Sequence, residues 1–88
     1  MKPKIRKDIY IREIKGEKVI YDKNEGKVHF LNRTATFIFE LCDGSNNRED
    51  IINRLIDSYE VDQHTAEKDV EDVLKNFEEN HMLEGIHA

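Results

Sequence analysis

Residues 27–42 read KVHFLNRTATFIFELC and contain the change of period that decides the fold. Up to Phe30, the apolar residues Val28 and Phe30 alternate with the polar residues Lys27 and His29, a period of two that is typical of a strand. From Asn32 onward the apolar residues recur about every 3.6 positions, which is helical spacing. An Asn before an apolar run is a favoured N-cap, because its side chain accepts a hydrogen bond from a free backbone N–H. The stretch therefore predicts a strand over 27–31 and a helix that begins after Asn32.

The residues before this stretch predict two more strands. Runs of β-branched and aromatic residues over Ile9–Ile14 and Val19–Asp22 are separated by turn signals at Gly16 and at Asn24-Glu25-Gly26. Turns as short as these join antiparallel neighbours. Side chains of the third strand alternate between two faces, with Val28 and Phe30 on one and Lys27, His29 and Leu31 on the other. Only one of these two sets can be fully buried.

The residues after the stretch predict two further helices. Asp43-Gly44-Ser45-Asn46 ends the first helix, Asn47 caps a second helix that reaches Tyr59, and Asp62 caps a longer third helix. An apolar tail of Met82, Leu83 and Ile86 is expected to fold back on the core. The predicted fold class is α+β and winged-helix-like, with a three-stranded antiparallel sheet followed by three helices. We expect one domain over residues 1–88, with a flexible N-terminal segment over residues 1–8.

Length and charge limit what the chain can bind. At 88 residues and 10.4 kDa it has room for one core. Residues 1–31 carry nine Lys or Arg against five Asp or Glu, a balance of +4, whereas residues 32–88 carry five against fourteen, a balance of −9. The predicted third helix, residues 62–80, has a balance of −5. In a winged-helix DNA-binding module this helix would meet phosphates, so its charge argues against nucleic acid as a partner.

The reactive residue types predict no catalytic or metal site. Cys42 is the single cysteine, which excludes an internal disulfide and favours a reducing compartment. The four histidines are scattered without a metal-binding spacing, and no cofactor is expected. The neighbouring carboxylates Asp69, Glu71 and Asp72 lie among lysines on a polar helix face, which is unsuited to acid–base catalysis. No apolar run is long enough for a signal peptide or membrane helix, so we expect a cytoplasmic protein that is not an enzyme.

A diffuse pattern of residues over about 9–86 resembles a known family. It comprises Leu31-Asn32, Ala35, Asp43-Gly44, a helix that ends at Tyr59, Asp69-Val70, Val73-Leu74, Phe77 and Met82-Leu83. This series is similar to the PqqD-like family of peptide chaperones, the stand-alone recognition elements of pathways that modify ribosomally made peptides. The chain differs in having Phe39 where the family often has Trp, and Asn80-His81 where a Gly is common.

The resemblance implies a binding function without chemistry. The partner would be the leader segment of a precursor peptide, which adds as a strand beside the third strand, is covered by the third helix, and is presented to a maturation enzyme. That enzyme could be a radical SAM protein or a leader protease, and the sequence does not decide between them. The implied peptide-binding positions are Lys27, Val28, His29, Phe30 and Leu31 on the strand and Asp69, Val70, Val73, Leu74 and Phe77 on the helix.

The free edge of a strand supports this interpretation and also leaves an alternative. Unpaired N–H and C=O groups at a sheet edge bind an added strand, and pockets beside it select its side chains. The same edge would allow the chain to pair with a second copy as a homodimeric adaptor. On the third helix, Asp69 and Val73 are the positions expected at the exposed border of the apolar stripe.

Overall fold

The computed structural model describes residues 2–15 and 17–84, and its sheet is an antiparallel meander. The strands are β1 (Ile9–Ile14), β2 (Glu17–Asp22) and β3 (Lys27–Leu31), paired in the order β1-β2-β3. The predicted bounds of the first and third strands are confirmed. The second strand begins two residues before its prediction, because Glu17 pairs with Ile14 across the hairpin. Gly16, the predicted break, lies outside the described residues.

Three helices follow the sheet, and each begins where the sequence predicts. They are α1 (Arg33–Leu41), α2 (Arg48–Tyr59) and α3 (Gln63–Glu79). Asn32 accepts a hydrogen bond from the backbone N–H of Ala35 at 2.8 Å, and Asp62 accepts one from Thr65 at 2.7 Å. Asn47 and Asp50 form a reciprocal capping box at the start of α2. These caps satisfy backbone donors that would otherwise lack partners.

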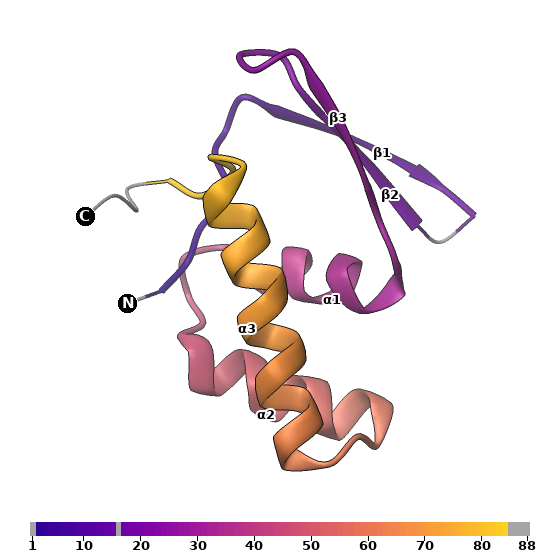
Figure 1. Cartoon of the computed structure of the whole chain (residues 1–88), viewed down its shortest axis with the longest axis vertical. Helices are drawn as coiled ribbons and strands as arrows, with labels where there is room; N and C mark the ends of the chain where they lie inside the picture. Colours follow the sequence, from indigo (N-terminus) through magenta and orange to yellow (C-terminus); the bar gives the residue numbers. More distant parts are fainter. Residues whose placement is uncertain (1, 16, 85–88) are drawn as a thin grey trace.

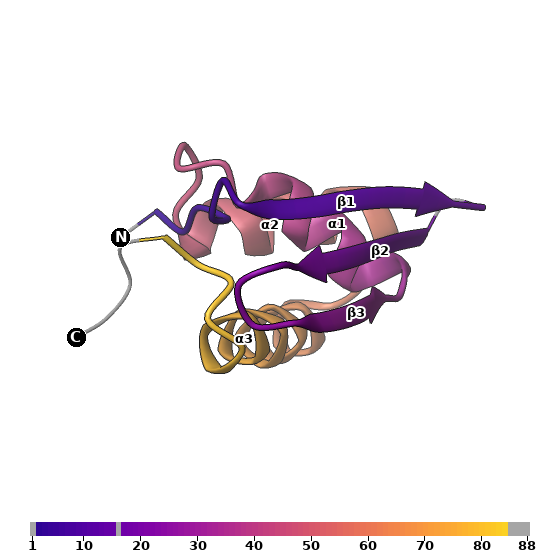
Figure 2. The same cartoon turned by 90° about the horizontal axis from the view of Figure 1, so that it is seen from above.

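The molecule has a sheet on one side and helices on the other (Figure 1). The sheet covers α1, whereas α2 and α3 cross at the end of the molecule away from the sheet. Seen from above, α3 runs beneath the β3 side of the sheet (Figure 2). The predicted α+β fold of three antiparallel strands followed by three helices is confirmed. No helix among the described residues is long and apolar enough to cross a membrane.

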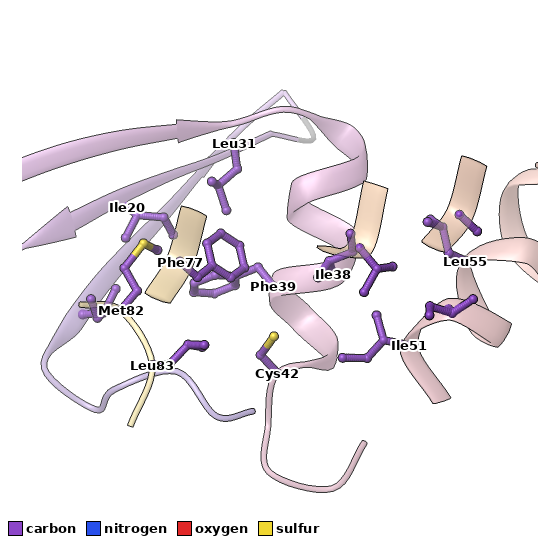
Figure 3. Packing of buried hydrophobic residues seen from close by; sticks show 14 residues of the cluster. Ile20, Leu31, Ile38, Phe39, Cys42, Ile51, Leu55, Phe77, Met82 and Leu83 are labelled. Carbon is purple, nitrogen blue, oxygen red and sulfur yellow. The ribbon is translucent and has the colours of Figure 1, made fainter. Parts of the chain in front are cut away.

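The core lies between the inner face of the sheet and the three helices (Figure 3). Ile20 from β2 and Phe77 from α3 are almost fully buried. The rings of Phe39 and Phe77 meet edge to face, with centroids 5.9 Å apart. Met82 and Leu83 are buried, which confirms that the tail folds back, while Ile86 lies outside the described residues.

The N-terminal segment makes backbone hydrogen bonds to the core over positions 3–6. Four backbone N–H groups make the connections, since Gly44 donates to Pro3, Ile5 to Cys42, Arg6 to Met82 and Glu84 to Lys4. These bonds join residues that are distant in sequence, so no local pattern announces them. The start of the chain thus lies between the loop after α1 and the C-terminal tail.

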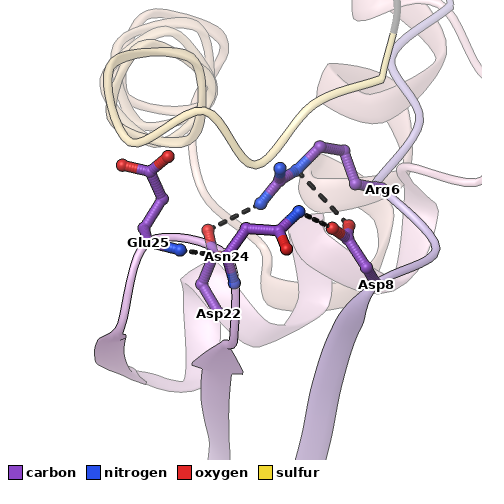
Figure 4. Close-up of polar contacts among 5 residues, drawn as sticks. All are labelled: Arg6, Asp8, Asp22, Asn24 and Glu25. Atoms are coloured by element: carbon purple, nitrogen blue, oxygen red, sulfur yellow. Dashed lines mark hydrogen bonds and ion pairs between the residues drawn. The ribbon is translucent and has the colours of Figure 1, made fainter.

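A buried ion pair also fixes this segment (Figure 4). The Arg6 guanidinium donates to Asp22 at 2.6 Å, and the Asp22 side chain is fully buried. The other carboxylate oxygen of Asp22 accepts hydrogen bonds from the backbone N–H groups of Asn24 and Glu25. Asp8 contacts Arg6 and accepts a hydrogen bond from the Asn24 side chain. The end of β2, the following turn and the N-terminal segment are therefore one polar cluster.

Candidate peptide-binding site

β3 is an edge strand whose second edge makes no strand pair among the described residues. It pairs with β2 alone, from Lys27 opposite Asp22 to Leu31 opposite Lys18. Its outer edge therefore offers backbone N–H and C=O groups for a further strand. The strand ends directly in the cap of α1, because Asn32 changes the backbone from strand to helix within one residue.

The helix nearest to this edge stands back from it. No Cα atom described in β3 lies within 8 Å of a Cα atom in α3. A cavity of about 210 Å³ lies between the start of α1, which follows β3, and α3. It is lined by Asn32, Thr34, Asp69, Asp72 and Val73. Since adjacent strands lie about 4.8 Å apart, an added strand beside β3 would enter the space on this side. We call the unpaired β3 edge together with this cavity the β3–α3 groove.

The structure separates the five predicted positions of α3 into three groups. Asp69 and Val73 are half-buried and line the β3–α3 groove, at the border of the stripe where they were expected. Leu74 is also half-buried but lines a different hollow, beside Leu83. Val70 and Phe77 are buried in the core, so their side chains are not accessible to a ligand.

The five predicted positions of β3 divide by the strand's two faces. Val28 and Phe30 point away from the helices, and Phe30 is 79% exposed. Leu31 points into the core and is 7% exposed, so it contributes packing and backbone rather than a contact surface. Lys27 is exposed. His29 is half-buried on the inner face, and its Nε2 is buried without a hydrogen-bond partner among the described residues.

Asn32, Thr34 and Asp72 line the groove but were not predicted as site residues. Asn32 stood out in the sequence only as a helix cap. Because β3 leads into α1 without a loop, the first turn of α1 lies at the end of the groove. That direct connection was the sequence signal for all residues of this turn.

Two larger hollows lie away from the strand edge. One of about 630 Å³ is lined largely by charged side chains of α2 and α3, and one of about 300 Å³ lies between Pro3, Leu74 and Leu83. Arg48 and Glu71 border both hollows and form an ion pair of 2.6 Å. The hydrogen bond from Arg48, together with its charge, lowers the pKa of the Glu71 carboxyl. Neither hollow is lined by a residue of β3 or of the first turn of α1, which follows it, so we favour the smaller cavity as part of a peptide site.

The described residues contain no group of three His, Cys, Asp or Glu side chains that could hold a metal ion. Cys42 is buried, and this burial, together with the nearby Asp43 charge, raises the pKa of its thiol to about 12. A thiol is nucleophilic as its thiolate, so Cys42 is inert at neutral pH. The groove offers backbone groups, apolar side chains and carboxylates, which are the elements of a binding surface.

A family model described as coenzyme PQQ synthesis protein D (PqqD) matches residues 17–83. The chain belongs to the PqqD family. The match begins at β2 and ends after α3, and so includes both sides of the β3–α3 groove. No curated protein sequence matches the chain.

Two solved structures share this PqqD-family fold over nearly their whole length. One is described as TbiB1 in complex with the TbiA(beta) leader peptide, with a TM-score of 0.84 and 26% identity over 97% of this chain and 99% of that one. The other is described as lasso peptide synthetase B1 complexed with the leader peptide, with a TM-score of 0.83 and 25% identity over 96% and 99%. Both similar proteins are therefore leader-peptide complexes, and the predicted family resemblance is confirmed.

Proposed function

We propose that this chain binds the leader segment of a ribosomally synthesised precursor peptide by strand addition at β3 and presents it to a separate modifying enzyme. The observation that carries the proposal is the unpaired β3 edge, which lies beside a cavity lined by α3. Membership of the PqqD family and the two similar leader complexes support it.

In this proposal the leader binds the backbone of Lys27–Leu31 as a fourth strand. Its side chains would alternate in direction, as in any strand. One set would enter the β3–α3 groove beside Asp69 and Val73, and the other would lie next to Val28 and Phe30 on the outer face. The carboxylates of Asp69 and Asp72 favour a leader residue with positive charge at the groove.

The expected affinity follows from these few contacts. Burial of two large apolar leader side chains contributes about 1.5 to 3 kcal/mol each. The backbone hydrogen bonds of the added strand add to this, and the ordering of a flexible peptide opposes it. A dissociation constant in the micromolar range or somewhat lower is expected. His29 Nε2 is buried without a hydrogen-bond partner among the described residues. A polar group of the leader that hydrogen-bonds to this atom would increase the affinity of the complex.

The proposed role requires no catalytic step by this chain. The Cys42 thiol is buried and protonated, and no metal-binding group occurs among residues 2–15 and 17–84. A winged-helix DNA-binding role is disfavoured, because α3 would bring a balance of −5 toward phosphates. We therefore assign the chemistry to the enzyme that receives the leader, whether a radical SAM protein or a protease.

The test is a fluorescence-polarisation titration of labelled leader peptides encoded by short reading frames near the gene. A scrambled peptide of the same composition and a random DNA duplex serve as controls at physiological salt. We expect saturable binding to one leader and none to the scrambled peptide or the duplex. Binding to DNA, or equal binding to the leader and its scrambled form, would overturn the proposal.

A further inference from the structure

The outer face of the sheet, which points away from the helices, is apolar and uncovered. Strand register places Tyr10, Tyr21 and Val28 side by side across the three strands, and Ile14 and Phe30 lie on the same face. All five are among the large apolar side chains that are exposed. The Tyr10 and Tyr21 rings have centroids 6.4 Å apart. We call these five residues the outer sheet patch.

This composition is unusual for a solvated sheet face. An antiparallel sheet with one buried face normally carries polar residues on the other. Contiguous exposed apolar patches instead mark interaction sites, and aromatic residues are enriched at protein interfaces. The inner face already supplies the core, so the outer sheet patch is not needed to cover the helices.

We propose that the outer sheet patch is the docking surface for the modifying enzyme, and that the enzyme meets it with an apolar patch bordered by carboxylates. This inference rests on the proposed function, because it assumes that the leader is handed to an enzyme. The leader pairs with the backbone edge of β3, and the enzyme uses the face of all three strands. The outward side chains of the leader, next to Val28 and Phe30, would extend this face, so both partners can be bound at the same time.

Charge around the patch determines the chemistry of the partner. Lys27 points to the inner face, like Leu31. The other side chains between residues 7 and 31 that make no ion pair in the described structure are four basic and two acidic, a balance of +2. They are Lys7, Arg12, Lys15 and Lys23 against Glu17 and Glu25. A second copy docked face to face would bring this same positive border against itself. A partner with carboxylates around its apolar patch has the complementary potential.

The area of the face also favours a partner that binds and leaves. Two strands of six residues and one of five cover about 15 by 20 Å, or about 300 Å² on each partner. A contact of about 600 Å² in total is below the range of stable dimers and typical of transient encounters. A head-to-tail contact between this face and the acidic helices of another copy would not close into a defined oligomer.

The experiment measures binding of the purified maturation enzyme encoded beside the gene to the immobilised chain. The test variant is the double substitution Tyr10→Ser/Tyr21→Ser. Ile11→Ser is the matched control. Ile11 follows Tyr10 on β1, and its side chain is about as exposed as the two tyrosines but points to the opposite face of the sheet. Neither variant alters the β3 edge, so leader binding and far-UV circular dichroism check that each protein is folded. If the double variant does not fold, Ile14→Ser at the strand end replaces it.

We expect the double variant to lose enzyme affinity at least about tenfold, and Ile11→Ser to stay within about twofold of the unaltered chain. Higher salt should weaken the unaltered complex. Three results would overturn the inference: no enzyme binding by the unaltered chain, equal binding by the double variant, or self-association in sedimentation that the double variant abolishes. The last result would assign the patch to a second copy. If the leader fails to bind while tyrosine-dependent docking persists, the proposed function fails and the docking surface stands.

Discussion

The two faces of the same small sheet differ in what they contribute. On the inner face, Ile20 and Leu31 are buried against the helices, and Asp22 is buried in an ion pair. On the outer face, the adjacent residues of the same strands, Tyr21 and Phe30, are exposed. A period of two therefore assigns stability to one set of side chains and recognition to the other. Substitutions on the two faces should separate these properties.

Among truncations of a side chain, Ile20→Ala is expected to have the largest effect on stability. Ile20 is fully buried at the centre of the sheet, so its truncation removes apolar burial and leaves a cavity. We expect the free energy of unfolding to fall by about 3 kcal/mol. Chemical denaturation monitored by circular dichroism measures this change.

Val19→Ala is the control for this prediction, because Val19 is the adjacent residue on the opposite face and is half-buried. Its truncation should cost less than about 1 kcal/mol. Equal losses in the two variants would contradict the division between the faces.

Asp22→Asn should have the next largest effect on stability. The substitution leaves the Arg6 guanidinium without its closest carboxylate in a part-buried position, and we expect a loss of about 2 kcal/mol. Asp8→Asn is matched to it, because Asp8 contacts the same guanidinium from a more exposed site, and should cost less than about 0.5 kcal/mol. Thermal unfolding of both variants makes the comparison. Similar midpoints for the two would show that burial of Asp22 does not matter.

Local signals in the sequence predicted most of the fold. Asn32, Asn47 and Asp62 are confirmed as caps because capping depends on residues three positions apart. The start of β2 was wrong by two residues, since pairing with β1 decides it. The attachment of residues 3–6 was missed for the same reason, because its partners lie in the loop after α1 and in the C-terminal tail.

The candidate site could be predicted only in part. Helical spacing identified the apolar stripe of α3, and Asp69 and Val73 were expected at its exposed border, where the structure places them. Spacing could not show that Val70 is covered while Leu74 opens to another hollow, because that depends on which elements pack on each side. The same limit applies to Thr34, which lines the groove from the first turn of α1.

Substitutions at Val28 and Leu31 should affect different properties although both lie on β3. Val28→Asp places a charge on the exposed outer face next to the added leader strand. We expect the fold to be retained and leader affinity to fall about tenfold in fluorescence polarisation. Leu31→Asp places a charge in the core and should unfold the chain. Unchanged leader binding by folded Val28→Asp would show that the leader does not lie beside this strand.

The smallest expected effect is that of an outer-face substitution on the closure of the core. Cys42 reports closure, because burial raises its pKa to about 12 and at pH 8 only about one thiol in ten thousand is ionised. A thiol reagent should therefore label it only when the structure opens. We expect Tyr21→Ser to change the labelling rate by less than about twofold, since Tyr21 covers no core residue from the outer face. Ile20→Ala should raise the rate about a hundredfold, in proportion to its loss of about 3 kcal/mol. If Tyr21→Ser labelled as fast as Ile20→Ala, the outer face would be part of the folding core, and its exposed aromatic residues could no longer be assigned to recognition.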